Sequence, residues 1–329
     1  MRRPHARRFG FAVLAVAFGL GVGLAAVEVI ARAVPLVVDK TMIPFREMPG
    51  DEAFAPQPSA RARTLRGKIE QTNRFGLRDP ERPLVRPEHA LPRVALVGDS
   101  VVWGFGLDAD DAIPRRLEAE LLAAGTPAEA WTLAQPATNM ANHRARWARL
   151  GPQVQPDALV TFVVFNDLLP TPTRFRITPQ GLLASPRRRA PYPDAVRPFI
   201  DRSAAFALAL RGVYAWEQRS QPHLDYSLEN VDRLTADLAA IIELDPSIPA
   251  LVVLVPGRGE TSEEYQGMRE ALSALAERED VRLLDLSEPL GQPAADRFMQ
   301  TNDSTHPNAL GSALIAQAIA PVVGELLGR

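Results

Sequence analysis

The chain has 329 residues, of which 46% are hydrophobic, enough to bury a sizeable core in one large domain or two small ones. Its formal net charge of −2 gives no reason to expect a nucleic-acid partner. It has no cysteine, which excludes disulfides, thiolate catalysis and cysteine metal sites but leaves the cellular compartment open.

Residues 1–34 predict a membrane segment at the amino end. Four arginines within the first eight residues precede an uncharged apolar run from Phe9 to Val27, whose length of about 19 residues is close to a membrane span. The basic flank should stay in the cytoplasm, which would place the rest of the chain on the periplasmic or extracellular side. Ala31-Arg-Ala33 resembles a signal-peptide cleavage site, although the apolar run is longer than the usual signal core. We therefore expect an uncleaved transmembrane helix, with a cleaved signal peptide as the alternative.

Residues 35–90 form a lead-in that is rich in proline and arginine. Prolines at this density argue against long helices, so we expect a stalk that becomes ordered near the domain. The stretch Asn73-Arg-Phe-Gly-Leu-Arg-Asp-Pro80 is more specific than a linker, because Gly76 between two apolar residues predicts a structured turn packed on the domain.

Residues 91–329 alternate predicted strands and helices, which is typical of a parallel sheet covered on both sides. Five short segments, most of them apolar, predict the strands, at 94–97, 130–134, 158–165, 251–255 and 281–286. Helices are expected from about Asp111, Asn139, Leu234, Tyr265 and Ala309, the last one running to Leu327. The fold class is therefore α/β, with a five-stranded parallel sheet and right-handed crossovers.

The alternation breaks between about residues 170 and 228, which we interpret as an insertion over one end of the sheet. The run Arg187-Arg188-Arg189 within it fits a solvated loop, and the alternative is a contact with an acidic glycan or with lipid headgroups. We find no internal repeat.

The segment that follows the first strand could carry a nucleophile. Gly98-Asp99-Ser100 turns the chain sharply after the apolar run, and Gly104 and Gly106 keep the next segment slim. A serine at the carboxyl end of a parallel strand lies in the crevice where open α/β sheets bind ligands. The next helix can point its amino end at a developing anion. Taken alone, however, Gly-Asp-Ser is also ordinary turn chemistry.

Of the five histidines, only His306 has a partner to which the sequence can point. Asp303 precedes it by three residues, in a loop that leads into the last helix. This spacing lets the carboxylate accept from one imidazole nitrogen, which leaves the other nitrogen free to take a proton from a serine. The alternative is a polar loop that only caps the helix.

Asn166 ends the long apolar run of the third strand. Its side chain would point into the same crevice as Ser100, where an amide can donate to an oxyanion. The alternative is an asparagine that satisfies a turn.

Together these segments resemble the SGNH, or GDSL, hydrolase family. Val97-Gly-Asp-Ser-x-x-x-Gly-x-Gly106 resembles its first block, Phe165-Asn166-Asp167 its third, and Asp303-x-x-His306-Pro-Asn-x-x-Gly311 its fifth. The stretch Asn73-x-x-Gly-x-Arg78 resembles the segment before the first block in membrane-anchored members. The resemblance covers about residues 70 to 329 and implies a flavodoxin-like, three-layer α/β/α fold.

The same resemblance implies serine ester chemistry with no metal or organic cofactor. By position, Ser100 would be the nucleophile, His306 the base and Asp303 its orienter. The oxyanion hole would consist of the backbone N–H groups of Ser100 and Ala137 and the amide of Asn166. The chain departs from the family pattern in the second block, where alanines replace the Gly-x-x-Gly-like turn, and at Val164, where glycine is usual. These departures affect the expected substrate access and oxyanion geometry more than the triad.

The sequence thus predicts a membrane-anchored serine ester hydrolase or acyltransferase facing outward. Its substrate would be an acyl ester, with an O-acetyl group on a cell-envelope glycan as one candidate. A lipid or thioester hydrolase is one alternative. A catalytically silent envelope-binding protein is another.

Overall fold

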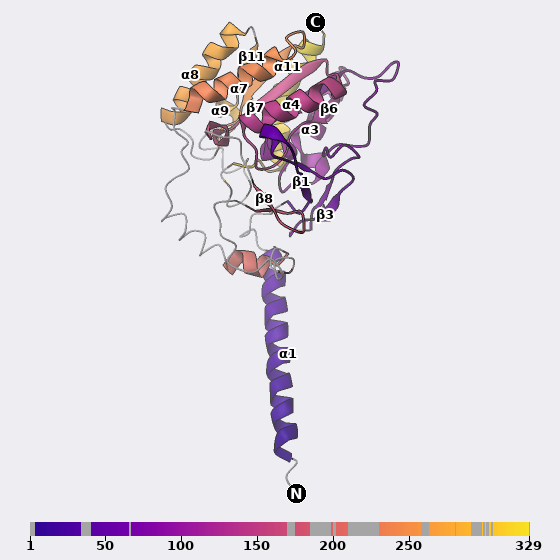
Figure 1. Ribbon diagram of the computed structural model, residues 1–329, viewed down its shortest axis with the longest axis vertical. Helices are drawn as coiled ribbons and strands as arrows, with labels where there is room; N and C mark the ends of the chain where they lie inside the picture. Colours follow the sequence, from indigo (N-terminus) through magenta and orange to yellow (C-terminus); the bar gives the residue numbers. More distant parts are fainter. Residues whose placement is uncertain are drawn as a thin grey trace. The chain divides into compact units, whose positions relative to one another are not determined.

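The computed structural model describes residues 4–33, 41–65, 67–169, 175–184, 199, 202–209, 230–257, 263–279, 281–290, 298, 300, 303 and 305–328. They divide into two compact units (Figure 1). One unit combines Met1–Val38 with Tyr192–Pro222, and the other combines Asp39–Pro191 with His223–Arg329.

A five-stranded parallel sheet forms the centre of the second unit (Figure 1). Its order is β11-β10-β7-β5-β6, with bounds β5 (Arg93–Val97), β6 (Glu129–Thr132), β7 (Ala158–Val163), β10 (Ala250–Leu254) and β11 (Arg282–Asp285). The predicted α/β class and parallel sheet are confirmed. The chain moves from β5 to β6 on one side and then to β7 on the other, so the strand order reverses at β5. This is the flavodoxin-like order, whose crevice opens at the carboxyl ends of β5 and β7.

Helices cover both faces of the sheet and complete three layers. One face carries α3 (Ile113–Ala123) and α11 (Ala309–Leu327), and the other carries α4 (Met140–Val154), α7 (Val231–Glu243) and α8 (Glu263–Arg278). Alternate residues of β5 supply the two cores, because successive strand side chains point to opposite faces. Val94 and Leu96 join the α3 and α11 side, whereas Ala95 and Val97 join the other.

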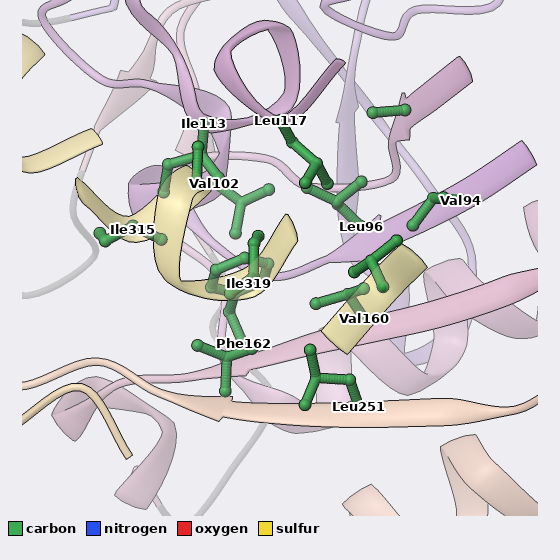
Figure 2. Packing of buried hydrophobic residues seen from close by; sticks show 14 of the residues in the cluster. Val94, Leu96, Val102, Ile113, Leu117, Val160, Phe162, Leu251, Ile315 and Ile319 are labelled. Carbon is green, nitrogen blue, oxygen red and sulfur yellow. The ribbon is translucent and has the colours of Figure 1, made fainter. Parts of the chain in front are cut away.

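Figure 2 shows the first of these cores, in which strand and helix side chains interlock. Val160 and Phe162 of β7 and Leu251 of β10 lie beneath Ile315 and Ile319 of α11. Every residue of β5, β7 and β10 is buried, which explains why their sequences are largely apolar, with Arg93 and Thr161 as the polar exceptions, instead of alternating.

Among the described residues, two helices are long and apolar enough to cross a membrane. Ala309–Leu327 is 44% buried and contributes its inner face to the sheet's core, so it is a core helix. Gly10–Ala33 lies within α1 (Pro4–Ala33), and its most apolar 18-residue window has no buried residue. The expected N-terminal apolar helix is therefore present.

From Asp39 onward, the lead-in belongs to the same compact unit as the sheet. Short antiparallel pairs build this lead-in: β1 (Phe45–Glu47) with β2 (Phe54–Pro56), and β3 (Arg61–Arg63) with β4 (Ile69–Gln71), with the 3₁₀ turn η1 (Gly50–Glu52) between the first two. Phe45 and Phe54 are fully buried and contact each other edge to face. The proline-rich lead-in therefore contains short packed strands.

Buried polar contacts tie this lead-in to the rest of its unit. The Glu52 carboxylate accepts from the Arg146 and Arg149 guanidinium groups of α4 at 2.6–3.1 Å. The Gln135 amide donates to the Phe54 carbonyl at 2.7 Å. The predicted turn at residues 73–80 is formed, with Asn73 Oδ1 accepting from two backbone N–H groups of the turn.

The expected insertion at 170–228 lies largely outside the described residues, including Arg187, Arg188 and Arg189. Its described parts include a small hairpin, β8 (Arg176–Ile177) with β9 (Leu183–Ala184), which belongs to the unit of the sheet. The remaining short elements are α2 (Ser100–Trp103), η2 (Ala109–Asp111), η3 (Phe165–Leu168) and α9 (Ser287–Leu290).

Candidate active site

Ser100 opens the short helix α2 directly beyond the carboxyl end of β5. Asp99 caps this helix, because its Oδ1 accepts from the Val101 N–H at 2.9 Å. Gly104 ends the helix in the left-handed conformation, with φ of 74°, which glycine adopts without a steric penalty. A tight turn therefore holds the Ser100 hydroxyl at the reversal point of the strand order.

His306 reaches Ser100 from a loop more than two hundred residues further along the chain. Its Nε2 lies 2.8 Å from Ser100 Oγ, and its Nδ1 lies 2.7 Å from Asp303 Oδ2. Asp303 Oδ1 accepts from the backbone N–H groups of Thr305 and His306 at 2.8 and 2.9 Å. Asn308 then caps α11, accepting from the Gly311 N–H at 2.9 Å. The structure thus brings the three predicted residues into one continuous chain of contacts.

The positions of the protons in the Ser100–His306–Asp303 contacts follow from which of their atoms can only accept a hydrogen bond. Burial favours the neutral form of Asp303, but the hydrogen bond from His306 and the two backbone donors outweigh it, so the pKa of Asp303 is lowered. An ionised carboxylate can only accept, hence the proton of His306 sits on Nδ1. The lone pair of Nε2 is then directed at the Ser100 hydroxyl.

Two residues that the sequence analysis did not single out hold the His306 ring. The ring of Phe105 stacks on it, with 4.6 Å between centroids and 29° between planes. Gln300 contacts the backbone of both ring residues. Its own backbone N–H donates to the His306 carbonyl at 2.9 Å, and its side-chain amide donates to the Phe105 carbonyl at 2.5 Å. A Cβ at Gly106, where φ is 73°, would come within 2.6 Å of Gln300 Oε1. The only sequence signal for this contact is the Gly-x-Gly spacing.

Asn166 lies beside Ser100, at the start of η3 after β7. Its amide Nδ2 donates to Asp99 Oδ2 at 3.0 Å and to the Thr138 carbonyl at 3.4 Å. Asp99 Oδ2 also lies 3.2 Å from Ser100 Oγ, farther than His306 Nε2 does at 2.8 Å. Asp99 therefore bridges the serine and the asparagine, a contact that no local spacing in the sequence indicates.

Ala137 adopts the left-handed conformation, with φ of 65°. It precedes Thr138, whose carbonyl meets the Asn166 amide. The backbone at this position thus has the conformation for which glycine is preferred, although the residue carries a methyl group. Holding a non-glycine residue there costs roughly 1–2 kcal/mol.

The described residues contain no group of three or more His, Asp or Glu side chains arranged to hold a metal ion.

Comparison with known proteins identifies the family. Residues 96–314, more than half of the chain, match the model of the GDSL-like lipase/acylhydrolase family. The chain belongs to this family and is a GDSL-type ester hydrolase. The matched span begins in β5 and ends in α11, so it contains Ser100, Asn166, Asp303 and His306.

Several solved structures are similar to the chain. One is TesA, with 16% identity, coverage of 71% of this chain and 99% of that one, and a TM-score of 0.48. Another is a lipase/acylhydrolase from Enterococcus faecalis, with 13% identity, 71% and 96% coverage and a TM-score of 0.48. A third is the psychrotrophic esterase EstA from Pseudoalteromonas sp., with 13% identity, 72% and 99% coverage and a TM-score of 0.44. No curated protein sequence matches the chain significantly.

Proposed function

We propose that Ser100 is the nucleophile of this ester hydrolase, that His306 is its general base, and that the Asp303 carboxylate orients His306. The observation that carries the proposal is the pair of contacts at 2.8 and 2.7 Å that joins the three side chains. A serine hydroxyl is a weak nucleophile unless an adjacent base takes its proton. His306 Nε2 is in position to do so, and Asp303 stabilises the imidazolium that results.

The reaction would proceed in two displacements. Ser100 Oγ attacks the acyl carbonyl carbon as its proton moves to His306 Nε2, and the tetrahedral intermediate collapses when that proton passes to the leaving alkoxide. The acyl group is then bound to Ser100 as an ester. A water molecule, or the hydroxyl of an acceptor, repeats the sequence and releases the acyl group, restoring the Ser100 hydroxyl.

The oxyanion of each intermediate would be bound by the N–H groups of Ser100 and Ala137 and by the Asn166 amide. Ser100 is the first residue of α2, and the first N–H groups of a helix have no acceptor within it. The Asn166 amide lies close enough to Ser100 that both contact the same Asp99 oxygen, and it would turn one of its two N–H groups from its present acceptor to the oxyanion.

For the substrate we propose a short acyl ester, with an O-acetyl group on a cell-envelope glycan as the first candidate. Cleavage of long-chain lipid esters or thioesters is the second candidate. A panel of esters that differ only in acyl length separates them. The hypothesis of a silent binding protein predicts no turnover of any ester in that panel.

The triad is tested by labelling the full chain in detergent with a fluorophosphonate. We expect labelling at Ser100 that Ser100→Ala abolishes and His306→Ala slows strongly. Asp303→Ala should also slow it, because the imidazole loses its orienter. Folded protein that is not labelled at Ser100 and cleaves no ester would overturn the proposal.

We further propose that α1 is retained as a membrane anchor. Glu28 accepts from the backbone N–H groups of Ala204 and Ala205 and from Ser203 Oγ at 2.9–3.0 Å, and Arg32 donates to the Arg202 carbonyl at 2.7 Å. These contacts support retention, because cleavage after Ala33 would remove every one of them.

The mass of the mature protein distinguishes an intact N-terminus from one cleaved after Ala33. A reporter fused after Arg329 that is active only outside the cytoplasm would support the predicted orientation. Activity of a cytoplasm-only reporter there would contradict it.

A further inference from the structure

Beside the proposed oxyanion hole lies a buried cluster that the reaction above does not use. It consists of Thr138, His143 of α4 and Asp167 of η3, each at most 2% exposed. Thr138 Oγ1 lies 3.0 Å from His143 Nε2, and His143 Nδ1 lies 3.7 Å from Asp167 Oδ1. Thr138 directly follows Ala137, and Asp167 directly follows Asn166. The cluster therefore connects the two loops that carry the proposed oxyanion donors.

Counting protons fixes the direction of each contact. Thr138 Oγ1 lies 2.8 Å from the Gln135 carbonyl, which can only accept, so the single hydroxyl proton of Thr138 points there. Thr138 Oγ1 must then accept from His143, which places the His143 proton on Nε2. His143 Nδ1 is left with a lone pair, and it faces Asp167 Oδ1.

The facing pair needs one more proton. Neither His143 Nδ1 nor Asp167 Oδ1 has a hydrogen-bond partner within normal distance, and both atoms are buried. A lone pair opposite an ionised carboxylate oxygen would repel it, whereas a protonated Asp167 has a hydrogen to direct at Nδ1. Asp167 Oδ2 meanwhile accepts from the Val164 N–H at 2.9 Å, which leaves Oδ1 to carry the proton.

The surroundings favour the neutral form of both groups. Burial, followed by the positive charge of Arg146, lowers the pKa of His143 to about 3. Burial, followed by the negative charge of Asp99, raises the pKa of Asp167 well above its usual value. Two neutral partners avoid the cost of a buried ion pair.

We propose that Asp167, His143 and Thr138 form an uncharged, one-directional relay of hydrogen-bonding groups that positions the proposed oxyanion hole. The inference rests on the proposed function of Ser100, Ala137 and Asn166. His143 donates to Thr138 and Thr138 donates to the Gln135 carbonyl, and the proton of Asp167 faces His143 Nδ1 across 3.7 Å. The relay holds the Gln135–Thr138 turn against η3, and the Thr138 carbonyl in turn meets the Asn166 amide.

The relay explains how an alanine can occupy the turn of the second block. A non-glycine residue at positive φ persists only where the surrounding structure over-determines its conformation. The three contacts to Thr138, through its hydroxyl and its carbonyl, restrain the residue that follows Ala137. These are positioning residues, since none of them touches the reacting atoms.

Paired substitutions test the relay through kcat. Thr138→Val keeps the shape but removes the hydroxyl, and we expect kcat to fall about 10- to 100-fold with little change in KM, less than the full loss of an oxyanion donor. Thr138→Ser keeps the hydroxyl and should stay within about threefold of wild type. A residue that serves only folding would lower thermal stability without this split between kcat and KM.

Asp167 separates the neutral relay from an ionic one. Asp167→Asn keeps a donor toward His143 Nδ1 and an acceptor for the Val164 N–H, so its kcat should remain within about threefold of wild type, whereas Asp167→Ala should resemble Thr138→Val. If Asp167→Asn loses as much activity as Asp167→Ala, the carboxylate is required as an anion and the relay is refuted.

The tautomer of His143 provides a readout that does not depend on activity. A two-dimensional ¹H–¹⁵N long-range correlation spectrum of the full chain, with His143→Phe to assign the signals, should show Nε2 protonated and Nδ1 unprotonated at neutral pH. A protonated Nδ1 would overturn the inference. Wild-type labelling and ester turnover at Ser100 are measured first, so that failure of the proposed function is seen separately from failure of the relay.

Discussion

Arg78 offers a sharp test of how the loop beyond Ser100 is held. Its side chain is buried, and its guanidinium donates to the carbonyls of Trp103 and Gly104 at 2.6 Å each and of Leu107 at 2.7 Å. Burial lowers the pKa of this guanidinium, but the shift leaves the group a cation because arginine begins so far above neutrality. One charged side chain therefore closes the turn in which Phe105 and Gly106 lie.

Replacing this residue in Arg78→Met keeps much of the apolar stem and removes all three donors. The Gly104 carbonyl keeps the Leu107 N–H at 3.1 Å, so the main cost falls on the carbonyls of Trp103 and Leu107, at about 1–3 kcal/mol for each carbonyl left without a donor. Release of the cost of burying the cation offsets part of that sum. We expect the free energy of unfolding to fall by about 3 kcal/mol. We also expect a lower kcat, because the same loop presents Phe105 to the His306 ring.

The matched control is Arg74→Met in the same turn. The Arg74 side chain is 58% exposed, lies 3.7 Å from Glu81 and is placed over the Phe75 ring, so its loss should cost at most about 1 kcal/mol. Denaturant unfolding of both variants, followed by tryptophan fluorescence, gives the comparison. Equal stability of the two variants would refute the clamp.

Three further predictions concern the site itself. Asn166→Ala should lower kcat by about a hundred- to a thousandfold with little change in KM, as measured by steady-state ester hydrolysis, because the amide acts mainly on the transition state; an unchanged kcat would assign Asn166 to the turn alone. Ala137→Gly should raise the free energy of unfolding by about 0.5–1 kcal/mol in denaturant titration, because relief of the left-handed strain exceeds the entropy that glycine adds to the unfolded chain; a less stable variant would show that Ala137 is unstrained. The folded-state pKa of Asp303 is depressed, so its stabilising contribution should be complete above the unfolded value of about 4 and be lost as pH falls through the folded value. Melting temperatures of wild type and Asp303→Asn should accordingly converge at acidic pH, and a constant gap across the pH range would contradict the assignment.

The layers of the fold could be predicted because the strands and helices that form them are marked by apolar segments and helix caps in the local sequence. The buried strands of the centre are largely apolar segments, and α11 begins and ends at the residues expected for it. Asn139 is the expected cap of α4. Boundaries differed where an apolar run continues past the paired residues: β6 ends at Thr132 and β7 at Val163, before the runs do. Hydropathy indicates burial, and Leu133, Ala134 and Val164, just beyond these strands, are buried although they lie outside the strand bounds.

The site could be predicted only as far as its contacts are close in sequence or recur in a family. Asp303 and His306 are three residues apart, so their pairing follows from spacing. Asp99 with Asn166, and Gln300 with Phe105, meet only because the sheet and α11 bring distant loops together. His143 has no partner that the sequence indicates, for the same reason. It lies in α4, whereas Asp167 lies in η3, after β7.

The lead-in shows a similar limit. Its prolines correctly argue against long helices, but they do not exclude short antiparallel pairs. Glu52 and Gln135 anchor these pairs to α4 and to the loop after β6, and neither contact has a signature in local sequence. Composition alone therefore predicts a lead-in that becomes ordered near the domain, but not the short strands into which part of it folds.

The order in which the site's parts occur along the chain has a consequence for biosynthesis. Ser100 follows the first strand of the parallel sheet, whereas Asp303 and His306 follow the last. A chain emerging from the ribosome thus displays its serine long before the base has been made, and in the proposed mechanism an isolated hydroxyl is a poor nucleophile. Such non-local contacts form late, after the cost of closing a long loop has been met. Nascent and prematurely terminated chains should consequently be chemically inert, and hydrolytic activity would arise only when the loop before α11 docks beside β5.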